Sequence, residues 1–513
     1  MRRIVNYRPI CFFALFEALG LFTAAVGRSV SAVRIFAISA ALFAAAVLLI
    51  YGKKKFIYIP AAFTLGILLF SGVYDIYQSR AFSYGDAEIT ATIASEIIDA
   101  DDYFFFEAEN ISVGGEKLKG RATVYAYSLP EERAGDEIKI KGKISTREFT
   151  LDGKFLSKYA KKNFYTVSAV EIEGRGKGKT EFISGIRLNL KRKLYAATDS
   201  DTTGIVSALL FGDKFAVYGG FYENVIDSGL AHIFAVSGLH IGILAAVFYY
   251  IAKKLKLNGK RSFIVVTCAT LLYGAMCGYP PSVVRAIVMT SVFMLASALG
   301  RKRDNMNSLS LAAVIVMTAY PAQLFSAGFL MSFFAVLGIL VLNKPLNEKL
   351  GFLPRGIRDI TSTSLSVNIM LLPIMCAFFG KVQILFLISN LIILPILPFI
   401  FIISLIICLL VMIMPFAAPL LGVLSAVVWP IKFVSTAIGG LALSSFAVKS
   451  AGLLSIAFYA VLLITSRYVN LTKVQKGALC LSVTAVVFAV IVAADYLHLE
   501  LFTSADINAI LKL

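Results

Sequence analysis

The sequence predicts a polytopic α-helical membrane protein of about 13 spans that carries one small β-barrel domain outside the membrane. Three observations support this fold class. Hydrophobic residues make up 58% of the 513 residues and charged residues only 16%, which is too apolar for a soluble protein of this size. Apolar runs of span length recur from residue 9 towards the C-terminus. One stretch, residues 81–180, instead alternates apolar and polar residues, which is typical of strands.

The first 80 residues predict an N-terminal membrane segment of three helices, at about 9–27, 31–51 and 56–76. The basic start runs into an apolar segment without a convincing cleavage site, so we expect a retained helix rather than a signal peptide. Glu17 falls in the middle of the first span. A carboxylate there costs roughly 2.5–3.5 kcal/mol on insertion scales, so it should face a partner or water, or be protonated. A buried structural hydrogen bond explains it at least as well as a polar point on a path.

Residues 81–180 predict about five strands, which together form a small external β-barrel or sandwich similar to the oligonucleotide-binding (OB) fold. Turns such as Gly114-Gly115 and Pro130 separate the strands. The five alternating runs are DAEITATIASEII, DYFFFEAENISV, GRATVYAYS, DEIKIKGKIS and YTVSAVEIEG.

Charge is divided within and just after this stretch, with acids dominating residues 86–137 and bases dominating residues 138–193. A basic half with interleaved aromatic residues could track a phosphate backbone and stack bases. A solvated surface with a membrane-facing basic stretch is an equally good interpretation. The first interpretation assigns DNA binding to Lys139, Lys141, Lys143, Lys161, Lys162 and Tyr165.

Residues 181–226 predict interfacial helices, at 181–198 and 202–213, that lie on the membrane surface. Residues 227–500 predict the main transmembrane domain, and residues 501–513 a short tail. The run at 383–412 is too long for one straight span and contains Pro395 and Pro398, so we expect a broken or tilted helix. The ten spans expected in the main domain lie at about 231–252, 262–278, 282–299, 308–325, 328–343, 361–380, 383–412, 415–438, 452–467 and 477–497.

Basic loops orient the chain. With a cytosolic N-terminus, the loops KKLKLNGKR, RKRDNMN, NKPLNEKLGFLPRGIR and RYVNLTKVQK all lie inside, while the β domain and the C-terminal tail lie outside. The net charge of +18 then follows largely from cytosolic loops and by itself implies no polyanionic partner.

The stretch DSGLAHIFAVSGLHIGIL, residues 227–244, holds His232 and His240, two of the three histidines of the chain. Between them Ser237-Gly238 is a weak point for a helix, because Gly loses more entropy on ordering and Ser competes for backbone hydrogen bonds. Non-helical backbone at membrane depth usually lines a cavity or a path. A lone membrane histidine is more often a helix–helix hydrogen bond, but two histidines around a break favour a lined path.

Two other side chains bear on chemistry. Arg285 lies one turn into its span from Pro280-Pro281, where it can snorkel outward or offer its guanidinium to a phosphate. Ser237 has His232 and His240 nearby as potential bases, but no orienting carboxylate is evident.

The segment AHIFAVSGLHIGIL resembles the signature of the ComEC-type competence proteins, the inner-membrane DNA-uptake channel family. The segments ALLFGDK, GYPPSVVRAIVM, RDNMNSLSLAAVIVMTAYPAQLFSAGFLMSFFAVLGIL and the run from Asn390 to Pro398 match in order, so the resemblance covers almost the whole chain. It implies a channel for single-stranded DNA in natural transformation, multi-pass in the bacterial cytoplasmic membrane. Leu330 stands where the family usually has Gln, which removes a polar group. The path residues that the resemblance implies are His232, Ser237, Gly238, His240, Pro280, Arg285, Asp304, Asn305, Gly328, Ser332 and Phe333.

Many members of that family continue into a metallo-β-lactamase-like domain, which needs clustered His and Asp ligands. The remaining histidine here, His498, stands alone, so we expect a short form without a metal, a cofactor or enzymatic activity. No G-x-x-x-x-G-K-[ST] loop is present, so any ATP-driven step belongs to a partner. The implied partners are single-stranded DNA, membrane lipid, a separate ATPase and, for the nuclease role, another protein; self-association stays open.

Two alternatives belong to other functional classes. The scaffold could transport a lipid-linked or other anionic metabolite, which would need a closed midplane pocket rather than a continuous groove. It could also be an intramembrane hydrolase with Ser237 as nucleophile, and that alternative falls if Ser237→Ala leaves activity intact.

Overall fold

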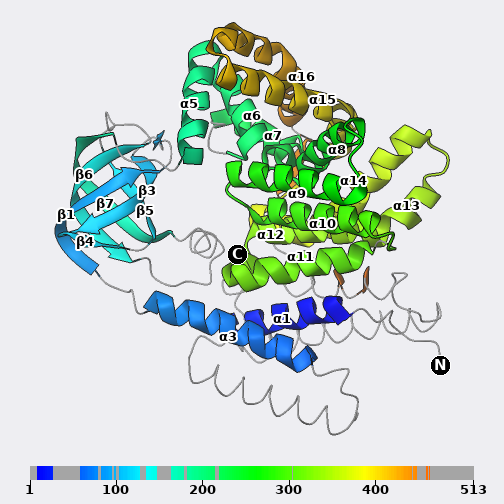
Figure 1. Ribbon diagram of the computed structural model, residues 1–513, viewed down its shortest axis with the longest axis horizontal. Coiled ribbons are helices and arrows are strands. Elements are labelled where there is room, and N and C mark those ends of the chain that lie inside the picture. Colours follow the sequence, from blue (N-terminus) through cyan, green and yellow to red (C-terminus); the bar gives the residue numbers. More distant parts are fainter. Residues whose placement is uncertain are drawn as a thin grey trace. The chain divides into compact units, whose positions relative to one another are not determined.

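The chain forms two compact units, one of residues 16–197 with 317–323 and one of residues 1–15, 198–316 and 324–513. Figure 1 shows the barrel strands of the first unit and the helices α6 to α16 that dominate the second. The computed structural model describes residues 9–26, 58–78, 83–94, 97–99, 103–118, 120–127, 135–146, 163–177, 182–213, 219–302, 304–441, 443–447, 458–459 and 461–462.

The N-terminal helices α1 (Pro9–Val26) and α3 (Tyr58–Gln78) approach closely through glycines. A side chain at Gly20 would collide with the backbone of Phe63. Small residues at such crossings let helix backbones pack without a hydrophobic driving force. Glu17 is fully buried, and the Thr318 hydroxyl donates to its Oε1 at 2.8 Å. The Glu17 carboxyl therefore makes a buried hydrogen bond, which is one of the two explanations that the sequence left open for a carboxylate in the first span.

The five predicted strands are confirmed, and they close into a barrel. Strand β1 pairs with both β6 and β3, so the order β1-β6-β7-β5-β3 returns to its start. Only β5 and β7 run parallel; every other pair is antiparallel. This is the five-stranded Greek-key barrel architecture of OB folds. The strands are β1 (Ser83–Ile93), β3 (Phe104–Val113), β5 (Arg121–Ala126), β6 (Asp136–Thr146) and β7 (Asn163–Lys177), with short additions β2 (Ile98–Asp99) and β4 (Glu116–Lys117).

Alternating side chains fill the barrel interior. The fully buried members include Ile89, Phe106, Ile138 and Ile140. Gly142 lies at a register shift between β6 and β7, where a side chain would collide with the backbone of Ser168. Glycine there permits the close approach that bends the sheet into a barrel.

The helical unit holds five helices that are long and apolar enough to cross a membrane among the described residues. They are Pro281–Ala298, Ala327–Lys349, Arg355–Cys376, Phe386–Ile413 and Phe416–Gly439. This finding fits a multi-pass membrane protein, but the predicted number of about 13 spans is not confirmed. The predicted spans at 31–51 and 477–497, and most of the one at 452–467, lie outside the described residues.

Most predicted elements recur with shifted bounds. The helices of this part of the chain are α5 (Phe182–Ala197), α6 (Ser200–Phe211), α7 (Gly219–Asp227), η3 (Ala231–Phe234), α8 (Gly238–Lys254), α9 (Gly259–Met276), α10 (Pro281–Ala298), α11 (Asn305–Ala319), η4 (Pro321–Phe325), α12 (Ala327–Gly338), η5 (Ile339–Asn343), α13 (Lys344–Lys349), α14 (Arg355–Phe379), α15 (Phe386–Ile413), η6 (Pro415–Val423) and α16 (Leu424–Gly439). Two short strands, β8 (Lys381–Gln383) and β9 (Ser445–Ala447), pair antiparallel.

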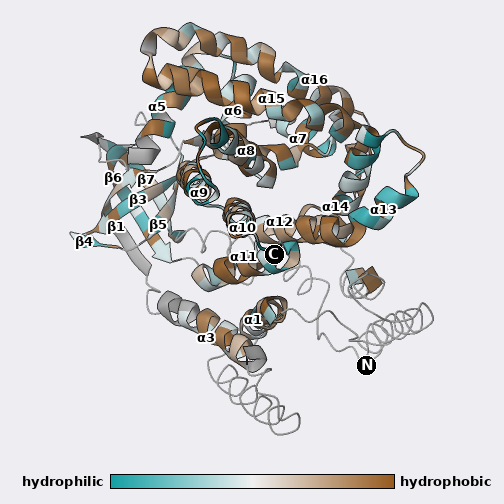
Figure 2. Cartoon of the chain, turned by 45° about the vertical axis from the view of Figure 1, so that its right-hand side comes forward, coloured by the Kyte–Doolittle hydropathy of each residue, from teal (hydrophilic) through white to brown (hydrophobic). Residues whose placement is uncertain are grey.

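Two expectations need correction. Helix α15 is one uninterrupted helix of 28 residues with Pro395 and Pro398 inside it. Of the two alternatives expected, the broken helix is therefore wrong, and the tilted helix stays a prediction. Neighbouring helices can satisfy the backbone groups that proline frees, which explains the continuity of α15. Helix α6 does not lie on a surface, because residues Thr202 to Phe211 are all buried. Hydropathy also differs between helices: Figure 2 shows that α15 and α16 are mainly hydrophobic, whereas α13 is hydrophilic.

Candidate functional site

The stretch around Ser237-Gly238 breaks where the sequence predicts. The 3₁₀ helix η3 ends at Phe234, and α8 begins at Gly238. Ser237 is the N-cap, with extended backbone, and its hydroxyl accepts from the Leu239 N–H at 3.2 Å. A short extended segment therefore separates the two histidines.

His240 completes this helix start. Its Nδ1 accepts the Ser237 N–H at 3.1 Å and lies 3.1 Å from the Ser237 hydroxyl. Because Nδ1 accepts, the ring proton belongs on Nε2. The ring is fully buried with Phe401 packed edge-on at 4.9 Å, and Nε2 has no hydrogen-bond partner among the described residues.

The contact between Ser237 and His240 caps a helix and lacks the rest of a catalytic unit. A nucleophile–base pair needs a third group that orients the base. In the described part of the chain nothing accepts a hydrogen bond from His240 Nε2. His232 is exposed and its Nδ1 bonds to the Gly229 carbonyl at 3.0 Å, so the two histidine rings have different hydrogen-bond partners.

Arg285 is the main electrostatic feature of this region. Arg285 is only 6% exposed, and its Nε has no hydrogen-bond partner among the described residues. No described residue forms an ion pair with its guanidinium. It points at the start of α8, where a Cβ added to Gly238 would lie 3.1 Å from Nη2. A buried, unpaired charge is costly, so a negative charge beside this guanidinium would be stabilising.

The start of α10 is tied to the extended segment. Pro280 is its N-cap residue, and the Ser282 hydroxyl donates to the Val236 carbonyl at 2.7 Å. The structure thus brings together Ser237, Gly238 and His240 from α8 with Pro280 and Arg285 from α10. The free N–H groups and dipole of a helix N-terminus favour anions, so Arg285 and the start of α8 have the same electrostatic preference.

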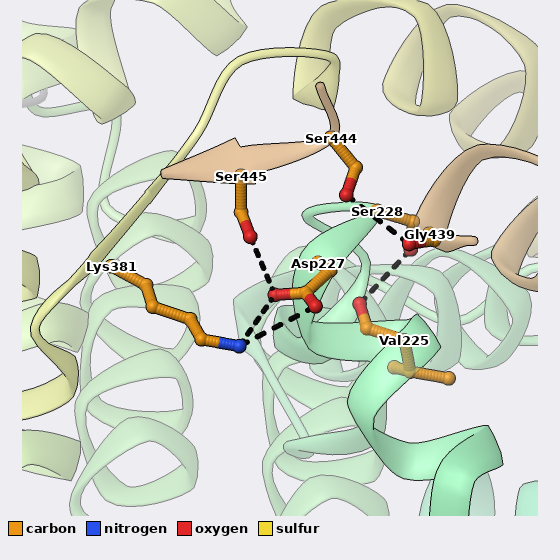
Figure 3. Close-up of polar contacts among 7 residues, drawn as sticks. All are labelled: Val225, Asp227, Ser228, Lys381, Gly439, Ser444 and Ser445. Atoms are coloured by element: carbon orange, nitrogen blue, oxygen red, sulfur yellow. Dashed lines mark hydrogen bonds and ion pairs between the residues drawn. The ribbon is translucent and has the colours of Figure 1, made fainter. Parts of the chain in front are cut away.

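A polar cluster anchors the chain just before this site (Figure 3). The Asp227 carboxylate accepts from Lys381 Nζ at 3.2 Å and from the Ser445 hydroxyl at 2.8 Å. At Gly229 an added Cβ would lie 2.6 Å from Phe386 Cβ. The end of α7 is therefore fixed to both strands of the β8–β9 pair and to the start of α15.

The third block of predicted path residues comprises Asp304, Asn305, Gly328, Ser332 and Phe333, and none of them makes a described contact with Arg285. Asp304 Oδ1 accepts the backbone N–H groups of Met306 and Asn307 at 3.1 and 3.2 Å, which caps α11. Asn305, the first residue of that helix, is exposed.

The other members of that block lie on α12. Phe333 stacks on Phe329 at 4.2 Å, while the Ser332 hydroxyl is buried without a partner among described groups. Gly328 has open space where a Cβ would be, and Leu330 is half-buried.

The barrel places the predicted DNA-binding residues in different surroundings, and the expectation is corrected for Tyr165 alone. Tyr165 is 1% exposed and cannot meet a ligand. Lys139 pairs with Glu88 at 2.8 Å. Lys141 bonds to Glu171 at 2.8 Å, and this hydrogen bond, followed by the charge of Glu171, raises the pKa of Lys141. Lys161 and Lys162 lie outside the described residues.

Exposed or half-buried groups of other kinds also lie on the outside of the barrel. Lys143 is exposed and forms no ion pair within the described part. Sequence reasoning missed a cluster of aromatic rings, Tyr103, Phe105 and Tyr125, on its outer surface. The alternation in DYFFFEAE places residues 103 and 105 on one face, which was the available signal. Among the described residues no group of three His, Cys, Asp or Glu side chains could hold a metal ion.

Comparison with known proteins shows that residues 209–473 match a family described as "Competence protein". "ComE operon protein 3" of Bacillus subtilis (strain 168) is 30% identical over 212 residues, which is 40% of this chain and 27% of that protein. "Competence protein ComA" of Neisseria gonorrhoeae is 29% identical over 136 residues, 25% of this chain and 20% of that protein. An "Uncharacterized protein" of Aquifex aeolicus (strain VF5) is 30% identical over 149 residues, 28% of this chain and 35% of that protein. The chain thus matches between 20% and 35% of the length of these three relatives. No solved structure matches it.

Proposed function

Because the chain belongs to the competence protein family, which it matches over residues 209–473 of its 513 residues, we propose that it takes up DNA as a channel for single-stranded DNA. The channel would cross the cytoplasmic membrane of a bacterium during natural transformation. The activity of its relatives enters here as a proposal, since each is matched over only part of its length.

The buried guanidinium of Arg285 is the observation that carries this proposal. It faces the start of α8 across Gly238 without a described partner. A DNA strand presents one phosphate per nucleotide, and guanidinium can bind phosphate through two parallel hydrogen bonds. Each passing phosphate would supply the missing negative charge for a short time and then move on. Weak or transient satisfaction of this kind is what conduction requires.

In this proposal the N-terminus is cytosolic and the barrel and C-terminus are external, and the Asp227 cluster supports the predicted alternation of spans, because it places three span ends on one side. Asp227, Lys381 and Ser445 are each expected at the outer end of a span, and their side chains meet. In this proposal a separate ATPase and, where needed, a nuclease act from other proteins, and membrane lipid surrounds the helices.

The test compares uptake and stability in Arg285→Met. A naturally transformable bacterium lacking its own copy is complemented with wild type, Arg285→Met, Arg285→Lys or the control Arg261→Met, whose residue is exposed. We expect Arg285→Met to lose cytosolic accumulation of labelled DNA while keeping or raising the melting temperature, because methionine removes a buried unpaired charge. Arg285→Lys should retain part of the uptake, since it keeps the charge without the two-pronged geometry.

Three outcomes would count against the proposal. A melting temperature that falls with uptake would make Arg285 a structural residue. Full uptake in Arg285→Met would remove it from the path. Full uptake without the protein would leave transport of another anionic metabolite as the better proposal.

A further inference from the structure

Helix α16 and the start of α6 border an open groove of about 610 Å³, which we call the α16 groove. Its volume lies within the range of about 300–1,000 Å³ that is typical of small-ligand sites. The lining residues of α16 recur at spacings of three and four, so they share one face of the helix. The residues that matter here are Ser425, Trp429, Lys432 and Phe433 of α16, with Asp199 and Thr202 at the start of α6.

Lys432 is the only charged residue of α16, and two carboxylates lie beside it. Its Nζ lies 2.9 Å from Asp199 Oδ2 and 2.7 Å from Asp201 Oδ2. Asp199 also accepts the Thr202 N–H at 3.4 Å as the N-cap of α6. No other described residue forms an ion pair with either carboxylate. A single carboxylate would neutralise a lysine in a span, so the second one leaves this cluster with a surplus of one negative charge.

The aromatic side of the α16 groove is uncovered. The rings of Trp429 and Phe433 stack with centroids 5.0 Å apart and an interplanar angle of 17°. Both residues are more than half exposed, at 57% and 55%. They lie on Phe416–Gly439, a stretch that is long and apolar enough to cross a membrane. Exposed aromatic rings towards one end of a span are typical of the membrane–water interface, and these two rings border charged groups.

The charges of the α16 groove discriminate among membrane lipids. A surplus negative charge repels an anionic headgroup such as that of phosphatidylglycerol and attracts an ammonium group. Carboxylates accept charge-assisted hydrogen bonds from a primary ammonium, whereas a quaternary ammonium has no N–H to donate. The face of an indole ring also attracts a cation. Lys432 directs two of its three N–H donors to Asp199 and Asp201, so the third remains for a phosphate oxygen.

We propose that the α16 groove binds the headgroup of phosphatidylethanolamine, with the ammonium on the Asp199 and Asp201 carboxylates and the phosphate on Lys432. The acyl chains leave the groove along the rings of Trp429 and Phe433. This lipid site shares no residue with the proposed DNA path. The inference rests on the proposed function only for the leaflet, because in that orientation the end of α16 is external and the lipid belongs to the outer leaflet.

The test uses the fluorescence of Trp429, which is the single tryptophan of the chain and therefore reports on this groove alone. The full-length protein is reconstituted in vesicles that mix phosphatidylethanolamine and phosphatidylglycerol. In each series one of the two lipids carries brominated acyl chains, which quench tryptophan on contact. We expect phosphatidylethanolamine to occupy the position next to Trp429 about fivefold more strongly than phosphatidylglycerol. Brominated phosphatidylcholine should fall between them, because it has the positive charge without the N–H donors.

Two variants test the role of the carboxylates. Asp201→Asn removes the surplus negative charge and keeps the Asp199–Lys432 pair, so the preference for phosphatidylethanolamine should fall to about twofold or less. The matched control is Glu348→Gln, which removes an exposed carboxylate from its pair with Lys344 and should leave the preference unchanged. Unchanged melting temperatures confirm that both variants fold.

Several results would overturn the inference. Equal quenching by all three brominated lipids would show that Trp429 contacts acyl chains without any selection of the headgroup. Stronger quenching by brominated phosphatidylglycerol would assign the groove to anionic lipids. A preference that survives Asp201→Asn would remove the surplus charge from the contact. Loss of the preference on addition of millimolar glycerophosphoethanolamine would make the occupant a soluble zwitterion rather than a lipid.

The two proposals fail independently. The quenching measurement contains no DNA, so normal uptake in cells lacking the protein would contradict the channel and leave the lipid site intact. Quenching that ignores the headgroup would contradict only the lipid site.

Discussion

At the scale of single residues, the region around Gly238 carries unsatisfied groups that a purely structural core would avoid. Nε of Arg285 and Nε2 of His240 are both buried and have no hydrogen-bond partner among the described residues. An unmade hydrogen bond of a buried group costs about 1–3 kcal/mol, and more for a charged group. Nothing in the described surroundings offsets that cost for Arg285, so its stabilising partner is best sought in a ligand.

Gly238→Ala tests that site with one methyl group, and Gly242→Ala on the same helix is its matched control. The added Cβ at 238 would lie 3.1 Å from Arg285 Nη2 and must displace the guanidinium, whereas at 242 it would meet nothing within 4 Å. Alanine favours a helix over glycine by up to about 1 kcal/mol. We therefore expect both variants to keep their melting temperature, while only Gly238→Ala lowers DNA uptake severalfold. Equal uptake in the two variants would contradict a role for the gap between Gly238 and Arg285.

At the scale of elements, close helix contacts fix where the site begins. Helix α16 reaches α7 at Gly439, where a side chain would collide with the backbone of Asn224. Helix α7 ends at Asp227, three residues after Asn224. The Asp227 carboxylate accepts hydrogen bonds from Lys381 and Ser445. The contact between α7 and α16 and the Asp227 cluster thus position the same short stretch of backbone.

Gly439→Ala should destabilise the protein, because backbone atoms of Asn224 cannot rotate away as a side chain could. Overpacking of this kind costs about 1–3 kcal/mol. The measurement is the melting temperature in detergent. Gly422→Ala in η6, where an added Cβ meets nothing within 4 Å, is the control. A melting temperature that does not distinguish the two variants would show that α7 and α16 can separate without cost.

At the scale of the whole molecule, the distribution of charge predicts how the chain crosses the membrane. Basic loops on one side and a β domain on the other follow the positive-inside rule. Orientation is a property of the entire chain, because each added or lost span reverses every later loop.

Cysteine labelling tests that orientation in a background whose native cysteines are replaced by serine. Glu116 and Arg301 are both exposed. Glu116→Cys, on the barrel, should react with a membrane-impermeant maleimide in intact spheroplasts. Arg301→Cys, between α10 and α11, should react only after permeabilisation. The reverse pattern would show that the proposed topology is inverted. Labelling of both sites in intact spheroplasts would contradict the odd number of spans predicted between them.

The sequence by itself determined the features that depend on local pattern. Composition identified an apolar membrane chain, alternation located five strands, and Ser237-Gly238 marked the start of α8. These follow from backbone propensity and side-chain period, which act over a few neighbouring residues. The break expected in α15 failed because a proline's effect depends on what surrounds the helix.

Only the tertiary structure decided which of these side chains can meet a ligand. Acids and bases that lie in separate halves of the sequence meet across the barrel, as Glu88 does with Lys139. Phe105 and Tyr125 form one face only because β3 pairs with β5 in a particular register. Whether Arg285 has a partner depends on every helix packed around it. The availability of a charge or a ring is set by contacts between distant parts of the chain, and closure of the fold alone fixes these.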